Sequence, residues 1–274
     1  MKYFILLLLF VTNVKAQTLE AIDIAGRQRM LTQKIAKDVL LVASGQTNKS
    51  IFNALQQSHA LFDVSLIHLR NGNLKLNIPK SPDALQPQLA QIQTLWQPTS
   101  DNIMKIINEE KADLASVELV MQNTAKLLAL SHQYVIDLSS ANSSQQNKSL
   151  LQRVNLTGKL RMLSQKIATQ ALSVCYHYHF FKNKNSAINT INEFNNIIEG
   201  LIVGNDYLRL KKVASHNELQ LLNATRSHWQ AYIDSLAPLL DIAYAVCDDA
   251  TIKHIQSKSM HVLFSANKTV QFIK

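Results

Sequence analysis

Apolar residues recur along almost the whole chain at intervals of three and four, the spacing of helices with one buried face. Polar stretches such as SGQTNKS, NGNLKLNIPKSPD, KNKNS and CDDAT interrupt this pattern, and they carry the residues that cap or end helices. Six glycines and five prolines among 274 residues are typical of an ordered, mainly helical protein. The pattern predicts helices over residues 18–44, 50–71, 83–108, 111–138, 146–181, 185–203, 207–246 and 249–273.

The chain is an internal duplication. GRQRMLTQKIA at residues 26–36 returns as GKLRMLSQKIA at 158–168, and the offset of 132 persists at Phe62 and Phe194 and at Gly72 and Gly204. Trp96 and Trp229 match at an offset of 133. The polar stretch SSANSSQQNKS, residues 139–149, reads as the linker between the copies. We therefore expect an all-α protein of two tandem up-and-down four-helix bundles, over residues 17–140 and 145–274.

The repeated helix has two different faces. One is ordinary apolar core. The opposite face combines small residues with one guanidinium and one amide, and small residues let another helix approach closely. In the first copy the apolar face consists of Ile24, Leu31, Ile35, Val39 and Val42. In the second copy the apolar face consists of Leu156, Leu163, Ile167, Ala171 and Val174. The small polar face of the first copy holds Ala25, Gly26, Arg29, Thr32, Gln33 and Ala36. That of the second copy holds Thr157, Gly158, Arg161, Ser164, Gln165 and Ala168.

These arginines are candidate ligands for a small oxyanion. If the two copies pack through their small polar faces about a pseudo-twofold axis, Arg29 and Arg161 face each other, and their charges repel unless an anion lies between them. A guanidinium keeps its proton and offers a planar fork of donors that matches planar oxyanions. The glutamine amides and the Thr32 and Ser164 hydroxyls are further candidate donors. Two alternatives remain: a solvated arginine, and a small-residue stripe that only dimerises the protein or docks a partner helix.

The first sixteen residues, MKYFILLLLFVTNVKA, read as a secretory signal that ends on a small-residue cleavage pattern. The apolar run is short for a membrane span, and no later stretch is long and uncharged enough to be one. We therefore expect a periplasmic or secreted protein, with an uncleaved anchor as the alternative.

The balance of charge is basic, with 28 Lys and Arg against 19 Asp and Glu and a formal net charge of +9. Loss of the signal would remove Lys2 and Lys15 and leave +7. Export and the lack of any run of five basic residues argue against nucleic acid, which leaves a small anion or a solubilising role. The sequence shows no nucleophile elbow, phosphate-binding loop, dinucleotide-binding turn or paired carboxylates, so we predict neither an enzyme nor a cofactor.

Cys175 and Cys247 are the two cysteines. A disulfide between two helices of the second half and a pair of buried free thiols are both open. In CYHYHFF, residues 175–181, Cys175, His177 and His179 are a weak metal pattern because only Cys175 and His179 share a helical face, so we predict aromatic packing and no metal.

The duplicated stretch resembles a known family. AGRQRMLTQKIAK at residues 25–37 and TGKLRMLSQKIAT at 157–169 resemble the signature of the PilJ-type sensor domain at the extracytoplasmic end of type IV pilus chemoreceptors. Both are also similar to the nitrate-binding helix of NarX-type nitrate/nitrite sensor kinases. The resemblance implies a four-helix bundle in which the arginine before the methionine, here Arg29 and Arg161, binds nitrate where two such helices meet.

This resemblance implies an exported sensor or binding protein for a small oxyanion, with nitrate or nitrite favoured. The chain differs from those sensors because it holds two copies and shows no transmembrane or kinase region. One chain would then be equivalent to a sensor dimer, and its signal would pass to a membrane receptor or sensor kinase. A homodimer, and a ligand-free helical interaction module, are the alternatives.

Overall fold

The computed structural model describes residues 2–142, 148–241 and 247–274, with side chains described from residue 18 onward. The first half contains four helices, and two short 3₁₀ helices, Leu74–Leu76 and Asp83–Leu85, lie between the second and third. The four are α1 (Lys2–Ala43), α2 (Lys49–Asn71), α3 (Gln86–Glu109) and α4 (Leu114–Ala141). The second half contains α5 (Lys148–Cys175), α6 (Phe180–Val203), α7 (His216–Asp241) and α8 (Asp249–Ile273).

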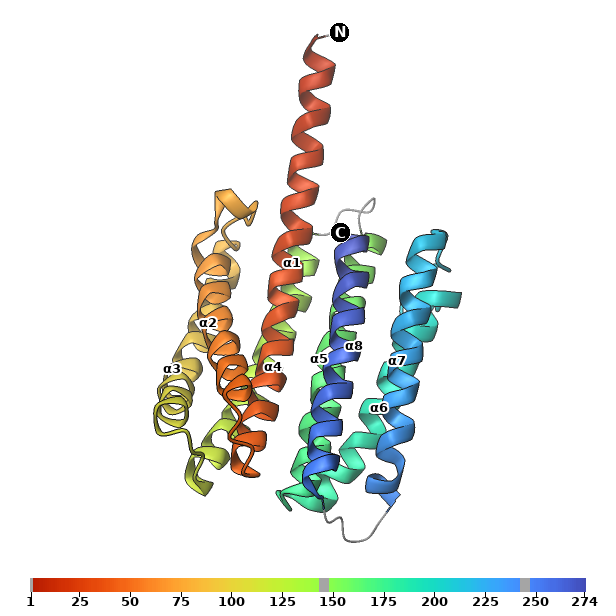
Figure 1. The fold of residues 1–274 in the computed structure, drawn as a ribbon. Helices are drawn as coiled ribbons and strands as arrows, with labels where there is room; N and C mark the ends of the chain where they lie inside the picture. Colours follow the sequence, from red (N-terminus) through yellow and green to blue (C-terminus); the bar gives the residue numbers. More distant parts are fainter. Residues whose placement is uncertain (1, 143–147, 242–246) are drawn as a thin grey trace.

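The helices form two up-and-down four-helix bundles side by side, α1–α4 and α5–α8 (Figure 1). This confirms the predicted all-α fold class. Helix α1 packs on α2 and α4, and its counterpart α5 packs on α6 and α8. The two bundles meet mainly through α1 and α5, which lie along each other at the centre of the molecule.

The central helices are buried on nearly all sides because each belongs to its own bundle and to the junction. The predicted apolar face is buried in both copies, from Leu31 and Ile35 to Leu163 and Ile167. The small polar face is buried as well, with Ala25 and Ala168 at 0% exposure. One contiguous apolar cluster therefore runs through both halves, where the sequence suggested a separate core for each.

Three predicted boundaries are wrong in the second half. Helix α5 ends at Cys175, not 181, and α6 begins at Phe180, because His177 and His179 adopt left-handed backbone conformations with φ of 58° and 47°. Helix α7 begins at His216, not 207. Residues 242–246 of that predicted helix lie outside the described residues.

The late start of α7 has a counterpart in the first half. Gly72 and Gly204, with φ of 77° and 93°, end α2 and α6. Each is followed by a short turn closed by an isolated antiparallel bridge, Asn73 with Ile78 and Asn205 with Leu210. The turn delays the next helix in both halves, so the duplication extends to loop structure.

Helix α1 includes the residues predicted to be a signal peptide, and its N-terminal part extends beyond the other helices (Figure 1). Cleavage of that segment stays a prediction. Across the helices of the described chain, none combines the length and apolar character that crossing a membrane requires.

The matched tryptophans anchor the two bundles. Trp96 and Trp229 are each 1% exposed, and they stack on Phe62 and Phe194 with ring centroids 4.0 and 3.8 Å apart. Burial and stacking together make the two tryptophans core residues.

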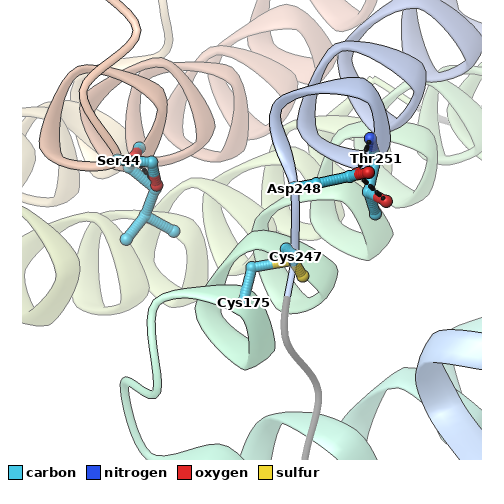
Figure 2. The surroundings of a disulfide bond; sticks show 6 residues. Ser44, Cys175, Cys247, Asp248 and Thr251 are labelled. Atoms are coloured by element: carbon cyan, nitrogen blue, oxygen red, sulfur yellow. Dashed lines mark hydrogen bonds between the residues drawn. A yellow bond between two sulfur atoms is a disulfide. The ribbon is translucent and has the colours of Figure 1, made fainter.

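Cys175 and Cys247 form a disulfide, with Cα atoms 5.3 Å apart (Figure 2). The bond joins the end of α5 to the residue before Asp248, whose carboxylate caps α8 by accepting a hydrogen bond from the Thr251 backbone N–H. The open question of the cysteines is settled in favour of the bridge, and Cys175 is therefore not a metal ligand. Within the described residues, no three His, Cys, Asp or Glu side chains gather as a metal site would require.

Candidate anion site between the two halves

Arg29 on α1 and Arg161 on α5 meet at the junction of the two bundles. They are 0% and 1% exposed, so both guanidinium groups are withdrawn from water. A Cβ atom built on Gly26 would lie 3.3 Å from Arg29 Nη2 and 3.5 Å from Arg161 Nη2. A Cβ on Gly158 would likewise lie within 3.7 Å of both groups. The two glycines therefore give the guanidinium groups the room to lie close together.

Each arginine crosses to the backbone of the opposite helix. Arg29 Nη2 donates to the carbonyl oxygen of Asn155 at 3.2 Å, and Arg161 Nη2 donates to that of Asp23 at 3.4 Å. Asp23 and Asn155 are counterparts at the offset of 132. The crossed bonds thus follow the pseudo-twofold relation of the duplicated halves.

The side chains at these two counterpart positions break the symmetry. Asp23 Oδ1 forms an ion pair of 2.6 Å with Arg161 Nη2, whereas the second copy offers Asn155 and no carboxylate to Arg29. Arg29 Nη1 instead lies 3.3 Å from Nδ1 of His132. Burial, and then the charge of Arg29, lower the pKa of His132 to about 4, so this imidazole is neutral near pH 7. Within the described part of the chain, Arg29 has no anionic partner in contact.

The junction carries an excess of positive charge. Burial and the neighbouring charge of Arg161 lower the pKa of Arg29 to about 9, which leaves it cationic at neutral pH. Burial raises the pKa of Asp23, but Arg161 and Lys274 outweigh it and hold the carboxyl well below its usual range. Asp23 is shared with Lys274, 2.8 Å from Oδ2, and with Arg27 at 3.5 Å. One carboxylate therefore serves three cations, and none of its contacts reaches Arg29.

Several buried polar atoms at this junction have no hydrogen-bond partner among the described residues. They include Nε of both Arg29 and Arg161 and the side-chain oxygen of Asn155. A buried charged donor without an acceptor costs free energy, so a small acceptor that reaches the guanidinium groups would stabilise the folded protein.

The remaining predicted donors turn away from the arginine side chains. Thr32 and Ser164 donate to the backbone carbonyls of Arg29 and Arg161 in their own helices, each at 2.8 Å. The Gln165 amide donates to Ser259 O on α8 at 3.1 Å, and the Gln33 amide lies 3.4 Å from the Thr32 hydroxyl. The structure thus brings together Arg29, Arg161, Gly26 and Gly158. The hydroxyls and amides of Thr32, Ser164, Gln33 and Gln165 lie on the same helices but bond to other groups.

Among the contacts that the sequence analysis missed are Asp23 and His132, and Asn267, whose side-chain oxygen accepts a hydrogen bond from Arg161 Nη1 at 3.3 Å. The duplication held a signal for Asp23, since an acidic residue stands opposite Asn155 one helical turn before the repeated glycine. His132 lies on α4, 103 residues from Arg29, and no local pattern connects the two.

Comparison with known proteins adds the family. The model of the type IV pili methyl-accepting chemotaxis transducer N-terminal family matches twice, over residues 11–120 and 142–245. The chain belongs to this family. Both matches include the repeated arginine helix, so the family assignment and the duplication coincide.

A curated relative is Protein PilJ of Pseudomonas aeruginosa, which is 23% identical over 222 residues. The matched region covers 79% of this chain and 31% of that protein. This chain therefore corresponds to about a third of its relative's length. The resemblance to NarX-type nitrate/nitrite sensors stays a prediction.

Proposed function

We propose that this protein is an extracytoplasmic sensory module that binds a small oxyanion, nitrate or nitrite first, between its two bundles. Membership of a chemotaxis transducer N-terminal family supports a sensory role. The single observation that supports the ligand is that Arg29 is fully buried and cationic, with no carboxylate in contact among the described residues.

The asymmetry of the junction favours a monoanion. Arg161 already has Asp23, so one additional negative charge near Arg29 suffices to pair both guanidinium groups. A planar oxyanion can accept two hydrogen bonds from one guanidinium, including the one that its Nε offers. Arg29 is then the principal ligand and Arg161 the second.

Signal output would pass through a partner at the membrane. The disulfide fits an oxidising compartment outside the cytoplasm, in line with the predicted signal segment. An anion held by both α1 and α5 changes the relative stability of their arrangements only if it binds one of them better, which is the requirement for a sensor.

The test is anion-dependent thermal stability of the purified protein. Nitrate or nitrite at about a hundredfold excess over the dissociation constant should add about 2.7 kcal/mol to the free energy of unfolding. For a chain of this size that corresponds to a rise of roughly 5–10 °C in Tm. Arg29→Ala should abolish the rise, and Arg161→Ala should weaken it.

Arg226→Ala is the matched control because Arg226 is a half-exposed arginine on α7, paired with Glu199 at 2.9 Å. Its anion response should equal that of the unmodified protein. Equal Tm values in chloride, nitrate, nitrite and other small anions would contradict the proposal and favour a ligand-free interaction module.

A further inference from the structure

A cavity lies between the bundles, and neither Arg29 nor Arg161 lines it. It has a volume of about 350 Å³, within the usual range for small-molecule sites, and α1, α4, α5 and the start of α6 line it. Its charged and titratable lining groups are Lys166, Lys182, His179 and Tyr178, and neither aspartate nor glutamate lines it. Amides of Gln33, Gln122, Gln170 and Asn183 complete much of its polar surface.

The duplication explains why this cavity exists. Lys34, Lys37 and Asp38 on α1 correspond to Lys166, Thr169 and Gln170 on α5. The aspartates that cap α4 and α8, Asp113 and Asp248, set an offset of 135 between those helices. At that offset Met260 on α8 corresponds to Ala125 on α4, which lines the cavity.

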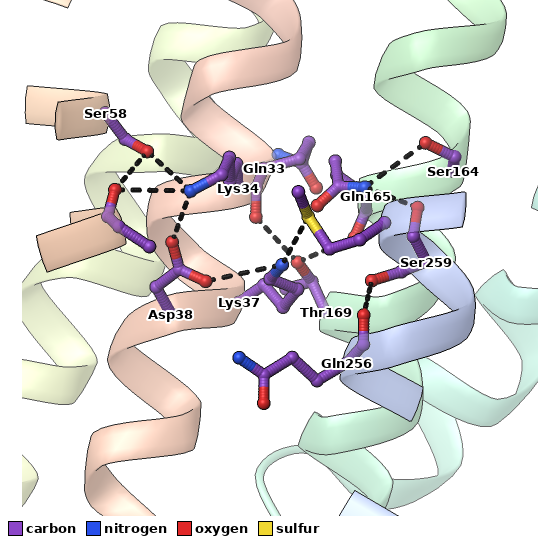
Figure 3. Close-up of polar contacts among 12 residues, drawn as sticks. Gln33, Lys34, Lys37, Asp38, Ser58, Ser164, Gln165, Thr169, Gln256 and Ser259 are labelled. Carbon is purple, nitrogen blue, oxygen red and sulfur yellow. Dashed lines mark hydrogen bonds and ion pairs between the residues drawn. The ribbon is translucent and has the colours of Figure 1, made fainter. Parts of the chain in front are cut away.

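The first copy of this region is a closed ionic network (Figure 3). Asp38 pairs with Lys34 at 2.8 Å and with Lys37 at 3.3 Å, and the Lys37 ammonium lies 3.7 Å from the Met260 sulfur. Lys34 also donates to Ser58 Oγ at 2.8 Å. Lys37 is only 1% exposed, so its side chain occupies protein interior.

The second copy has lost those groups. Gln170 replaces the carboxylate, and Thr169 and Ala125 replace the larger Lys37 and Met260. Lys166 consequently makes no hydrogen bond or ion pair within the described residues. Burial is the main effect on its pKa, which is lowered, while Glu193 acts to raise it.

Gln170 supplies a second, independent sign of a ligand. It is 5% exposed, lines the cavity, and its side-chain oxygen has no hydrogen-bond donor among the described residues. Gln170 lies one helical turn after Lys166 on the same face of α5. In the described part of the chain, a partly buried cation without a protein acceptor and a buried amide oxygen without a donor therefore adjoin one cavity.

We propose that this cavity binds a small hydroxy acid, whose carboxylate pairs with Lys166 and whose hydroxyl donates to Gln170. An amino acid meets the same two requirements less well, because its ammonium group would face a lining that contains lysines and no carboxylate. This second site is separate from the proposed oxyanion site at Arg29.

Malate is the probe, with succinate as the matched acid that lacks the hydroxyl group. Millimolar malate should raise the Tm of the full chain, and calorimetric titration should show at least tenfold weaker binding of succinate. Lys166→Gln should weaken malate binding at least tenfold, while the counterpart variant Lys34→Gln should leave it unchanged. Arg29→Ala should also leave it unchanged.

Gln170→Asp tests the same site in a variant that we expect to fold, because it rebuilds the Lys34–Asp38 pair at the second copy. The new carboxylate should satisfy Lys166 and abolish malate binding. The proposal is overturned by no response to malate, by an equal response to succinate, or by malate binding that survives in both Lys166→Gln and Gln170→Asp. Nitrate should still raise the Tm of Lys166→Gln. Failure of the malate site can therefore be distinguished from failure of the oxyanion site.

Discussion

At the scale of single residues, the junction depends on how few acceptors surround its cations. Asp23 and Asn155 occupy equivalent places, yet only the first carries charge. Breaking a buried ion pair leaves an uncompensated charge, which costs more than an exposed pair contributes. The presence of a carboxylate at residue 23 and an amide at residue 155 therefore decides that Arg29, and not Arg161, is available to a ligand.

Asp23→Asn should lower the free energy of unfolding at pH 7 by about 3–5 kcal/mol, because Arg161 loses the one ion pair that it makes within the described residues. Nitrate should then stabilise the variant more than the unmodified protein, since both guanidinium groups need an acceptor. Urea unfolding with and without nitrate measures both effects. An unchanged stability would show that the pair contributes nothing, and Asp234→Asn, at an exposed position of α7, is the control.

The same residue predicts a pH dependence. The pKa of Asp23 is lower in the folded protein than the value of about 3.9 in unfolded chains, so its stabilising contribution is present above that pH. The contribution decreases as the pH falls below about 4, because the carboxyl of the unfolded chain takes up a proton while the folded carboxyl stays ionised. Urea unfolding from pH 7 to 3 should therefore show a smaller acid loss for Asp23→Asn than for the unmodified protein, and identical profiles would contradict it.

At the scale of elements, the second half combines the same helices with one additional constraint. Its turn from Tyr176 to His179 replaces the helical continuation that the sequence predicted. The disulfide joins Cys175, at the end of α5, to the segment that leads into α8. Because α8 packs directly on α5, the bond holds together α8 and the helix that carries Arg161.

Removal of this bond should destabilise the protein. A cross-link that closes a loop of 72 residues restricts the unfolded chain and contributes about 4 kcal/mol in the chain-entropy treatment. Replacing both cysteines with serine should lower the free energy of unfolding by that amount, measured by denaturant unfolding followed by circular dichroism. Reductant should affect the unmodified protein and leave the double variant unchanged, and equal midpoints for the two proteins would refute the prediction.

At the scale of the whole molecule, we expect the two bundles to fold as one unit. The apolar cluster is continuous across them, and α1 and α5 pack along each other, with Arg29 and Arg161 each donating to the backbone of the opposite helix. A half on its own would expose Arg29 or Arg161 together with its small polar face. The duplication thus joins two modules that need a partner.

Residues 17–140 expressed alone should therefore either pair with a second copy through α1 or lose helicity, whereas the full chain should unfold in one transition. Light scattering after size exclusion and thermal circular dichroism separate these results. A monomeric, fully helical first half would show that its core is independent after all.

The sequence by itself determined most of the helices, the duplication and the equivalence of Arg29 and Arg161. Periodicity places apolar residues on one helical face, and the conserved spacing between the copies identifies Arg29 and Arg161 as equivalent. These features are local or repeat at a fixed offset, so a linear reading finds them. The predicted helix through residues 176–181 failed because its aromatic and histidine residues do not signal the left-handed turn that His177 and His179 adopt.

Only the tertiary structure decided which charges are satisfied. The Asp23–Arg161 pair, the contact of His132 with Arg29, and the cavity beside Lys166 each join residues from helices far apart in the chain. Electrostatic free energy depends on distance and burial in three dimensions, and sequence separation does not report either. The sequence alone thus identified the two arginines. That Arg29 lacks the ion pair that Arg161 makes with Asp23 is evident only in the three-dimensional structure.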